Sequence, residues 1–572
     1  MSTLPIRPYE RHAAVVAPWD PHCPDVAREL ARLINGVLPG VVAHHVGSSS
    51  VPGLAGKNVV DLAIEAVPDE IPLIAEAMLS LGFGRQTGVA PFPPTRPLLL
   101  GTVLHEAAPY RIHLHVMPPA RDELREILGF RDALRADAGL REAYADAKRA
   151  IVTAVGDGDG NRLYTVHKGD FVEEALLRLG IRRPSADRSD PLPPGSTIGI
   201  LGGGQLGRMM AFAARAMGYR IIALDPDPLC PTAAVADEII VGRYDDVEAA
   251  RRLGLASDVV TYELEHVGLA AASAAGEGAP LRPGLAALAA TQDRLAERRF
   301  LRSIGERTAP WREVRGVAEA SAAARELGLP MRLKTPIGGY DGRSQVRVVA
   351  ADGIAAGVAA LGGTDGRPLL AEAEIDYEAE LSVICARDRD GRTLAFPVSR
   401  NVHDDGVLAE TVAPAPIDPL VAADACSIAS WVARGLDAVG VITVELFALR
   451  GGGLMVNELA PRVHNSGHWT IEGAATSQFE QHLRAILGLP LGSAAPHGSA
   501  AMVNLLGTGP DRPARLAGVD AALADPRAKV HVYGKRRVFD RRKMGHITVA
   551  GVKDDSALAR ARQARAALHW ED

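Results

Sequence analysis

The chain has 572 residues, 47% of them hydrophobic, and carries a formal net charge of −6. This length predicts several domains, the hydrophobic content argues against wholesale disorder, and the acidic balance argues against a nucleic-acid partner. The four cysteines lie far apart with no CxxC pair, which is typical of a reducing compartment and argues against a zinc ribbon or a disulfide framework. The N-terminus is polar, and no apolar run reaches about eighteen residues, so we expect a cytoplasmic protein without a membrane span.

The first 180 residues have the pattern of a small α/β domain. Residues 41–67 predict a strand, a Gly-Ser turn, a loop and a second strand. Residues 72–84 predict an amphipathic helix that ends at a glycine. Residues 110–117 alternate like a strand, and residues 121–155 predict two charged helices.

Three motifs in this segment resemble the GrpB family, whose domain is related to nucleotidyltransferases. They are HVGSSSVPGL at residues 45–54, Asp61, and HLHV at residues 113–116, with further matches at residues 130–134, Tyr144, Lys148 and residues 168–171. The resemblance implies a nucleotidyltransferase-like α/β fold for residues 1–180. Nucleotidyl transfer usually needs two or three carboxylates around two metal ions. Ala63 stands where the second carboxylate of a D-x-D strand is expected.

The chemistry of this first domain therefore stays open. His113 and His115 point to the same face of a strand. With no third ligand in sequence reach, we interpret them as structural or substrate-binding residues rather than zinc ligands. A weak nucleotidyltransferase, a nucleotide-binding regulator, and a folding or assembly partner are all compatible with the sequence.

Residues 181–196 have the composition of a linker. They are rich in Pro, Ser, Asp and Arg and show no apolar period. We expect a domain boundary here, followed by subdomains over residues 197–295, 296–490 and 491–572.

A βαβ unit is predicted directly after the linker. Gly202, Gly204 and Gly207 fit G-x-G-x-x-G, and Asp225 ends the second strand. The pattern is typical of dinucleotide binding, but any anion at a helix N-terminus calls for the same glycines. Residues 258–267 then predict a strand that carries Glu263 and Glu265.

A nucleotide-binding region is predicted next. Lys334 ends a strand and is followed by a glycine-rich loop that includes Gly338 and Gly342, whose N–H groups can close over phosphates. No G-K-[ST] follows, so the loop is not a Walker A motif. A flexible hairpin turn is the plainer alternative for this loop.

The densest polar segment lies at residues 445–469. Glu445 sits in an apolar strand, a glycine turn follows, and a second strand ends in Asn457 and Glu458. A hairpin would bring both carboxylates to one end of a sheet. Two carboxylates and a carboxamide are oxygen ligands that suit Mg²⁺, and Mn²⁺ would fit the same set. An exposed polar turn is the alternative, but an acidic residue in an apolar strand is costly without a partner.

The segment at residues 458–470, ELAPRVHNSGHWT, resembles the ATP-grasp family of 5-(carboxyamino)imidazole ribonucleotide synthases. The resemblance covers about residues 197–550. It implies a Rossmann-like pre-ATP-grasp subdomain, an ATP-grasp subdomain and a small β-rich C-terminal subdomain. The implied reaction joins 5-aminoimidazole ribonucleotide, bicarbonate and ATP in purine synthesis, with carboxyphosphate as intermediate. The resemblance also implies a homodimer that acts on small molecules, whereas the acidic balance and the lack of a long apolar run predict that the chain binds neither nucleic acid nor membranes.

The resemblance assigns roles to individual residues. Arg462 and His464 would hold bicarbonate, and Glu445 and Glu458 would hold Mg²⁺. The loop residues Tyr340, Asp341 and Arg343 would close over the reacting centre and contact ATP. Further ATP contacts are implied for Arg298, Lys334, Gly339, Gly342, Ser344, Gln345, Glu372, Ala373, Glu374, Ile375, Glu380, His403, Asn457 and Glu458. Contacts with the ribonucleotide are implied for Gly204, Gln205, Leu206, Glu263, Lys535 and Arg542.

Two positions depart from the family pattern. Arg298 stands where a Lys is usual, and Ser344 stands where a Gly is usual. Other functions also stay open: an NAD-dependent oxidoreductase built on the first glycine motif, another ATP-grasp ligase, or a degenerate nucleotide-binding module. The basic segment around Lys535 and Arg542 has the further alternative of a solvated charged hairpin.

Overall fold

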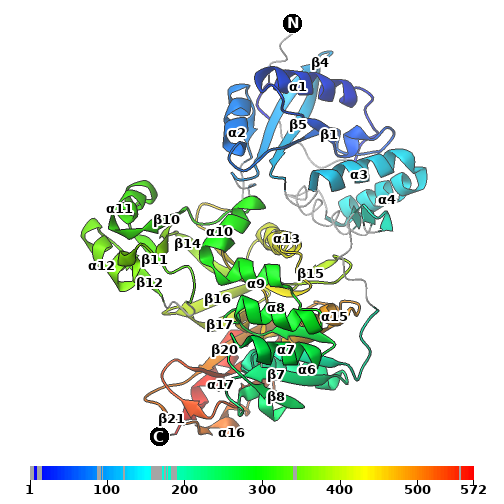
Figure 1. Cartoon of the computed structure of the whole chain (residues 1–572). Helices are drawn as coiled ribbons and strands as arrows, with labels where there is room; N and C mark the ends of the chain where they lie inside the picture. Colours follow the sequence, from blue (N-terminus) through cyan, green and yellow to red (C-terminus); the bar gives the residue numbers. More distant parts are fainter. Residues whose placement is uncertain are drawn as a thin grey trace.

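The computed structural model describes most of the chain (Figure 1). The described residues are 6–9, 16–86, 92, 94–119, 123–155, 171–172, 175–176, 178–181, 190–338, 344–552 and 556–571. The folded regions comprise an N-terminal domain before the expected linker and a larger assembly after it, with three main sheets and two two-stranded pairs among the described residues. Most of the linker lies outside the described residues.

The N-terminal domain is built on a mixed five-stranded sheet of order β1-β2-β5-β4-β3. Strands β2 and β5 pair in parallel, whereas the other neighbours are antiparallel. Apolar residues of α1, α2, β2 and β5 form the core of this domain. The elements are α1 (Cys23–Val37), β1 (His44–Val46), β2 (Val59–Glu65), α2 (Ile71–Ser80), β3 (Gly84–Arg85), β4 (Leu98–His105), β5 (Ala108–Met117), α3 (Glu123–Ala136) and α4 (Ala138–Val155).

The second sheet is the predicted βαβ unit extended to four parallel strands, in the order β8-β7-β6-β9. Its strands are almost continuously apolar, as expected for a parallel sheet covered on both faces. The elements are β6 (Thr197–Leu201), α6 (Gln205–Ala216), β7 (Arg220–Asp225), β8 (Glu238–Val241), α7 (Val247–Leu255), β9 (Val259–Tyr262), α8 (Leu269–Gly278), α9 (Leu285–Gln292) and α10 (Arg294–Ser303).

A small antiparallel sheet of order β10-β13-β11-β12 forms one wall of the site. Its register places Lys334 beside Gln345 and beside Leu370, and Arg332 beside Glu372. The nucleotide-binding side chains predicted from separate segments therefore share one sheet. The elements are β10 (Trp311–Arg315), α11 (Gly316–Leu327), β11 (Met331–Lys334), β12 (Gln345–Val348), α12 (Ile354–Ala360) and β13 (Pro368–Ala373).

A nine-stranded sheet runs through the rest of the chain, with β14, β16, β17, β20 and β25 in its centre. Because β17 pairs with β20, the C-terminal strands continue the same sheet rather than forming a separate one. Its strands are β14 (Tyr377–Arg387), β15 (Thr393–Ala395), β16 (Ser399–Asp404), β17 (Val407–Ala413), β18 (Gly440–Leu449), β19 (Leu454–Ala460), β20 (Ser499–Leu506), β23 (Ala528–Val532) and β25 (Lys543–Val552). The helices and short pairs around it are α13 (Pro419–Gly435), α14 (Thr470–Gly473), α15 (Gln478–Leu487), β21 (Arg512–Pro513), β22 (Leu516–Ala517), α16 (Val519–Ala522), β24 (Arg537–Val538), α17 (Ala557–Ala567) and β26 (His569–Trp570).

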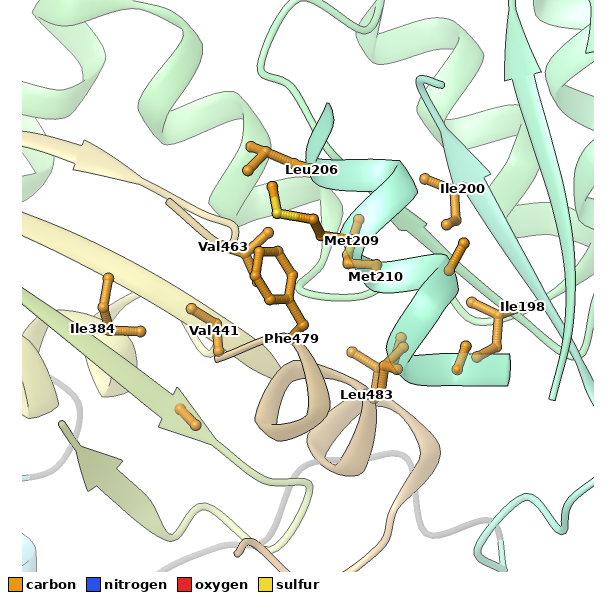
Figure 2. Close-up of a cluster of buried hydrophobic side chains, with 14 of the residues drawn as sticks. Ile198, Ile200, Leu206, Met209, Met210, Ile384, Val441, Val463, Phe479 and Leu483 are labelled. Atoms are coloured by element: carbon orange, nitrogen blue, oxygen red, sulfur yellow. The ribbon is translucent and has the colours of Figure 1, made fainter. Parts of the chain in front are cut away.

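A shared hydrophobic cluster fixes the parallel sheet against the nine-stranded sheet (Figure 2). Met209 and Met210 of α6 face Phe479 and Leu483 of α15, and Val441 of β18 lies in the same cluster. Each fully buried side chain of this size contributes about 1.5–3 kcal/mol. The two sheets are therefore held as one unit, and the site described below lies between them.

The N-terminal domain contacts this unit at the end of α10. The guanidinium of Arg96 lies 4.8 Å from the ring centroid of Trp431 and Nη1 lies 3.9 Å from Glu306 Oε1. Asp69 pairs with Arg302 on the exposed surface. These contacts between described residues are largely polar, and each part has its own hydrophobic core.

Candidate functional site

A single cavity of about 1290 Å³ collects most of the predicted site residues. Its wall is formed by the parallel sheet, the small antiparallel sheet, the β18–β19 hairpin and the C-terminal basic hairpin, which consists of β23, β25 and the residues that connect them. The predicted residues on the wall are Gln205, Leu206, Glu263, Lys334, Gln345, Glu372, Ala373, Glu374, Ile375, Glu380, His403, Glu445, Asn457, Glu458, Arg462, His464, Lys535 and Arg542.

The β18–β19 hairpin confirms the pairing predicted from the sequence. Glu445 and Glu458 lie directly opposite each other in the antiparallel register, which brings their Cβ atoms to about 5 Å. The register then shifts by one residue, leaving Asn457 as a β-bulge beside the pair. A bulge redirects a side chain, and Asn457 joins both carboxylates on the cavity wall.

The pair is electrostatically unfavourable when both groups are ionised. Burial, followed by the nearby charge of Glu458, raises the pKa of Glu445 to about 7. Glu445 is half-buried and Glu458 is exposed to the cavity side of the hairpin. Two like charges this close favour a bound cation, and all three donors on the hairpin are hard oxygens. The donor set therefore fits a divalent cation such as Mg²⁺.

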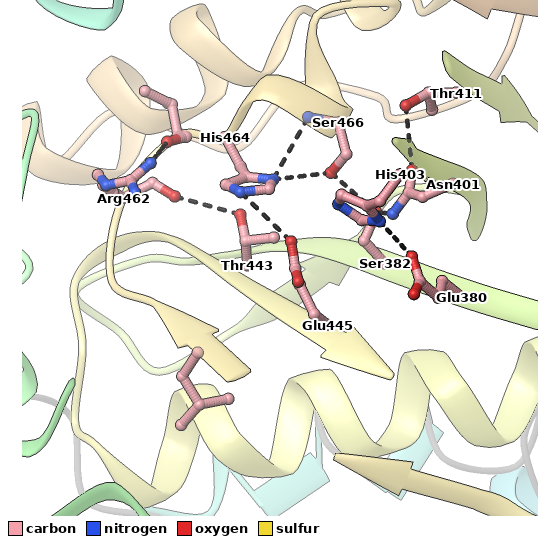
Figure 3. Close-up of polar contacts among 12 residues, drawn as sticks. Glu380, Ser382, Asn401, His403, Thr411, Thr443, Glu445, Arg462, His464 and Ser466 are labelled. Carbon is pink, nitrogen blue, oxygen red and sulfur yellow. Dashed lines mark hydrogen bonds and ion pairs between the residues drawn. The ribbon is translucent and has the colours of Figure 1, made fainter. Parts of the chain in front are cut away.

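His464 lies beside Glu445 (Figure 3). Its Nε2 is 3.4 Å from Glu445 Oε1, and its Nδ1 is 2.9 Å from Ser466 Oγ. Burial and the neighbouring Arg462 hold the pKa of His464 well below its usual range, so the ring is neutral. A neutral ring with Nδ1 engaged presents Nε2 to the cavity.

A chain of buried hydrogen bonds holds the His464 loop to the sheet. Ser466 Oγ and Ser382 Oγ lie 2.8 Å apart, and Asn401 Nδ2 donates to Ser382 Oγ over 2.9 Å. Thr411 Oγ1 donates in turn to Asn401 Oδ1 over 3.0 Å. Figure 3 shows this chain running from the loop into strands β14, β16 and β17. No local sequence pattern predicts this chain, because its members lie on four separated segments.

The expected phosphate end contains Lys334, whose Nζ lies 2.6 Å from Glu372 Oε2. Burial acts against ionisation of Glu372, but Arg298 and Lys334 outweigh it and lower the pKa of that carboxyl to about 2. Glu372 is therefore charged and holds Lys334 at the cavity wall.

Arg298 is placed differently from the sequence expectation. Its guanidinium is buried and donates to Glu372, to Glu297 and to the carbonyl of Asn457. Among the described lining residues of the cavity Arg298 does not occur. The N–H groups of its planar guanidinium are hydrogen-bonded to protein acceptors. In this conformation Arg298 therefore positions Glu372 and the bulge rather than binding a phosphate directly.

The hinge segment expected to contact the adenine, residues 372–375, lines the same part of the cavity as Lys334, and Glu380 also lines the cavity. Glu380 accepts a hydrogen bond from Tyr377 over 2.7 Å and pairs with His403. Burial lowers the pKa of His403, but the hydrogen bond to Glu380 and the charge of Glu445 raise it above its ordinary value. Tyr377 stacks on Phe447 with ring centroids 4.4 Å apart, and both line the cavity. Sequence reasoning missed this aromatic pair, whose members lie on different strands.

The backbone N–H groups of the glycine motif in the parallel sheet are hydrogen-bonded to the protein's own carboxylates. Glu263 accepts from the backbone N–H groups of Gly204 and of Gly207, the latter over 2.6 Å. Asp225 accepts from the N–H of Gly203 over 2.8 Å. These groups occupy the helix N-terminus where a dinucleotide pyrophosphate would bind, so the geometry argues against the oxidoreductase alternative.

Glu263 thus caps the N-terminus of α6, and it also lines the cavity. Its neighbour Glu265 forms an ion pair with Arg462, with Nε and Oε1 2.8 Å apart. Gly204 and Ser344 are not among the described lining residues. Gly339, Tyr340, Asp341, Gly342 and Arg343 lie outside the described residues.

The C-terminal basic hairpin reaches the wall of the same cavity. Lys535 Nζ donates to the carbonyl of Lys543 over 2.6 Å, and Arg542 Nη1 donates to the carbonyl of Arg537 over 2.7 Å. Arg541 and Lys543 line the cavity as well. Several cations therefore face a space whose other end carries carboxylates.

Comparisons with known proteins match four successive segments of the chain. The sequence matches the GrpB protein family over residues 13–178, the ribonucleotide synthetase preATP-grasp domain over 196–292 and the ATP-grasp domain over 299–479. It matches the phosphoribosylaminoimidazole carboxylase C-terminal domain over 500–560. A Brucella melitensis protein named N5-carboxyaminoimidazole ribonucleotide synthase is 46% identical over 357 residues, which cover 62% of this chain and 97% of the relative.

The chain belongs to this synthase family. A Bacillus subtilis synthase is 40% identical over 362 residues, covering 63% of this chain and 93% of the relative. The solved Thermus thermophilus synthetase has a TM-score of 0.59 at 40% identity and covers 64% of this chain and 97% of that one. The Aspergillus clavatus synthase, solved with ADP and 5-aminoimidazole ribonucleotide, has a TM-score of 0.59 at 31% identity, covering 65% and 98%.

These matches confirm the expected fold class: an ATP-grasp ligase of the synthase family follows a GrpB-type α/β domain. Among the described residues, no helix is both long and apolar enough to cross a membrane.

Proposed function

We propose that residues 197–550 catalyse the ATP-dependent carboxylation of 5-aminoimidazole ribonucleotide by bicarbonate, yielding 5-(carboxyamino)imidazole ribonucleotide, ADP and phosphate in purine synthesis. The observation that carries the proposal is the joint lining of one cavity by a nucleotide hinge, a paired-carboxylate hairpin and a cationic hairpin. The Aspergillus clavatus relative is described with ADP and 5-aminoimidazole ribonucleotide together, two ligands that a cavity of this breadth can hold.

ATP fits the end formed by the small sheet and the hinge. The backbone of residues 372–375 would meet the adenine edge, and Glu380 would accept from the ribose hydroxyls. The pKa of Glu380 is lowered, since its hydrogen bonds from His403 and Tyr377 outweigh burial, so it is an ionised acceptor. Lys334 would exchange part of its contact with Glu372 for the phosphates, and the loop at 338–344 would close over them.

Mg²⁺ would be held by Glu445 and Glu458, with Asn457 beside them. Bound there, it would neutralise phosphate charge and relieve the repulsion between the two carboxylates. Mn²⁺ would suit the same oxygen donors.

Arg462 and the neutral His464 are placed to hold bicarbonate. Bicarbonate is a poor electrophile, and transfer of the ATP γ-phosphoryl group to one of its oxygens gives carboxyphosphate, whose carbon the substrate amine attacks with release of phosphate. The chain's contribution is positioning and charge stabilisation. Glu265 orients the Arg462 guanidinium, and the Ser466–Ser382–Asn401 chain orients His464.

The ribonucleotide would lie between the parallel sheet and the basic hairpin. Lys535 and Arg542 would bind its 5-phosphate, with Arg541 and Lys543 adding to the positive field. Gln205 and Leu206, at the start of α6, would contact the rest of the nucleotide. We also propose a homodimer, from the family relation, and a cytoplasmic location, because the four cysteines form no disulfide.

An ADP-release assay on the purified full chain tests the function. Turnover should require ATP, Mg²⁺, bicarbonate and 5-aminoimidazole ribonucleotide together. Glu458→Gln keeps the shape and removes the charge opposite Glu445, so we expect at least about a 10²-fold loss of kcat. A melting profile like that of the unmodified chain serves as the folding control. ADP release that is indifferent to the ribonucleotide would refute the proposal.

A further inference from the structure

The N-terminal domain brings together three donor groups that the proposed synthase function does not use. Asp61 on β2 lies beside His113 on the parallel neighbour β5, and Ala63 lies beside His115. One oxygen of Asp61 and one nitrogen of each histidine all lie within 4.8 Å of one another. Asp61 and the two histidines are about 50 positions apart in sequence, so the pairing of β2 with β5 creates the cluster. Asp61 is the third donor whose absence from sequence reach argued against a metal role for the two histidines.

We propose that Asp61, His113 and His115 form a binding site for a divalent transition-metal ion of the Zn²⁺, Mn²⁺ or Co²⁺ class. Two imidazoles and one carboxylate on one face suit such ions, whereas Mg²⁺ and Ca²⁺ prefer oxygen ligands only. Among the described residues no fourth donor belongs to the group. Three protein ligands with further positions for water or a substrate oxygen are typical of a catalytic metal site.

The surroundings of the cluster fit a coordinating geometry. His113 Nδ1 faces Asp61 Oδ1 at 3.4 Å, and its other nitrogen, Nε2, lies 2.9 Å from the hydroxyl of Tyr9. A metal-bound histidine usually engages its second nitrogen in this way, which fixes ring orientation. His115 packs edge-on against Phe92, with ring centroids 5.9 Å apart.

The Gly-Ser turn leaves space for the carboxylate. Gly47 has a φ of 70°, and a Cβ added there would lie 2.3 Å from Asp61 Oδ2. Only glycine fits this position without displacing the carboxylate. The motif H-V-G-S-S-S is therefore tied to the placement of Asp61, and the imidazoles of β5 supply the donors that Ala63 cannot.

A second cluster in the same domain is a weaker candidate. His22, Asp25 and His105 also lie within ligand distance of one another. Asp25 pairs with Arg28, and His105 Nδ1 lies 3.4 Å from Glu29 Oε2. His22 is exposed, so this group resembles a surface ion-pair network and provides a matched control.

The test measures Zn²⁺ affinity of the metal-stripped full chain against a chromophoric chelator, with excess Mg²⁺ to occupy oxygen-only sites. We expect one Zn²⁺ per chain. Asp61→Asn and His115→Gln should each weaken binding at least about tenfold, Tyr9→Phe should weaken it less, and His105→Gln should leave it unchanged. Unchanged affinity in the first two variants, or loss only in His105→Gln, would overturn the proposal.

A second measurement does not depend on the folding of the variants. Pulsed electron paramagnetic resonance of the unmodified chain loaded with one Cu²⁺, again in excess Mg²⁺, should show modulation from imidazole nitrogens. Oxygen-only coordination, or no stoichiometric binding of either Zn²⁺ or Cu²⁺, would refute the assignment. ADP release by the synthase should be unaffected by His115→Gln, which separates this proposal from the function of residues 197–550.

Discussion

Glu445→Gln should stabilise the metal-free protein while abolishing its ATP-dependent turnover. The pKa of Glu445 is raised from 4.5 to about 7. Each unit of pKa difference corresponds to 1.36 kcal/mol, so full ionisation of Glu445 in the native state costs about 3 kcal/mol. A raised pKa in the folded state means that this cost is absent below pH 4.5 and grows as the pH rises through about 7.

The variant carries no charge at this position, so its gain in unfolding free energy over the unmodified protein should rise with pH in the same way. We expect a gain of about 3 kcal/mol over the unmodified protein at pH 8, and of only about 1 kcal/mol at pH 5. At a few degrees of melting temperature for each kcal/mol, the difference at pH 8 is measurable by thermal unfolding.

The assay is a pair of melting series with a chelator present, at pH 5 and at pH 8. A further pair at pH 8 contains Mg²⁺ and ADP, where the unmodified protein should gain more than the variant because it keeps both carboxylates. Glu380→Gln serves as the matched control, since the pKa of Glu380 is lowered rather than raised, and its substitution should not stabilise at pH 8. An equal effect of Glu445→Gln at both pH values would refute the reasoning.

Three further predictions concern other parts of the chain. Arg542→Ala should raise KM for the ribonucleotide about ten- to a hundred-and-fifty-fold and leave KM for ATP unchanged, because a charge-assisted phosphate contact contributes about 1.5–3 kcal/mol; an equal rise in both values would contradict a 5-phosphate role. Ser344 has a φ of 60° and its hydroxyl donates to the carbonyl of Gly338 over 3.2 Å, so Ser344→Ala should be less stable than Ser344→Gly by about 1 kcal/mol in denaturant titrations; the reverse order would exclude backbone strain. A chain of residues 190–572 should melt cooperatively and release ADP in the synthase assay, because its cores are its own; aggregation or inactivity would show that the N-terminal domain is required.

The sequence alone predicted the elements of the site that are contiguous in the chain. The hairpin of residues 445–469 could be predicted because the turn glycines and the strand alternation are local, and local geometry then dictates that Glu445 and Glu458 meet. The same holds for the βαβ unit at residues 197–225 and for Lys334 at the end of its strand. Family resemblance supplied the chemistry.

Only the tertiary structure decided which polar groups remain available to a ligand. Arg298 and Glu263 have side chains suited to phosphates and sugars. Arg298, however, is hydrogen-bonded to buried carboxylates, and Glu263 is hydrogen-bonded to backbone N–H groups at the start of a helix. Polar residues that can bind a ligand can be told from structural ones only when their hydrogen-bond partners in the protein are known. These partners come from distant segments of the chain. The Asp61–His113–His115 cluster arises in the same way: strand order places β5 beside β2, and no spacing within either strand records that pairing.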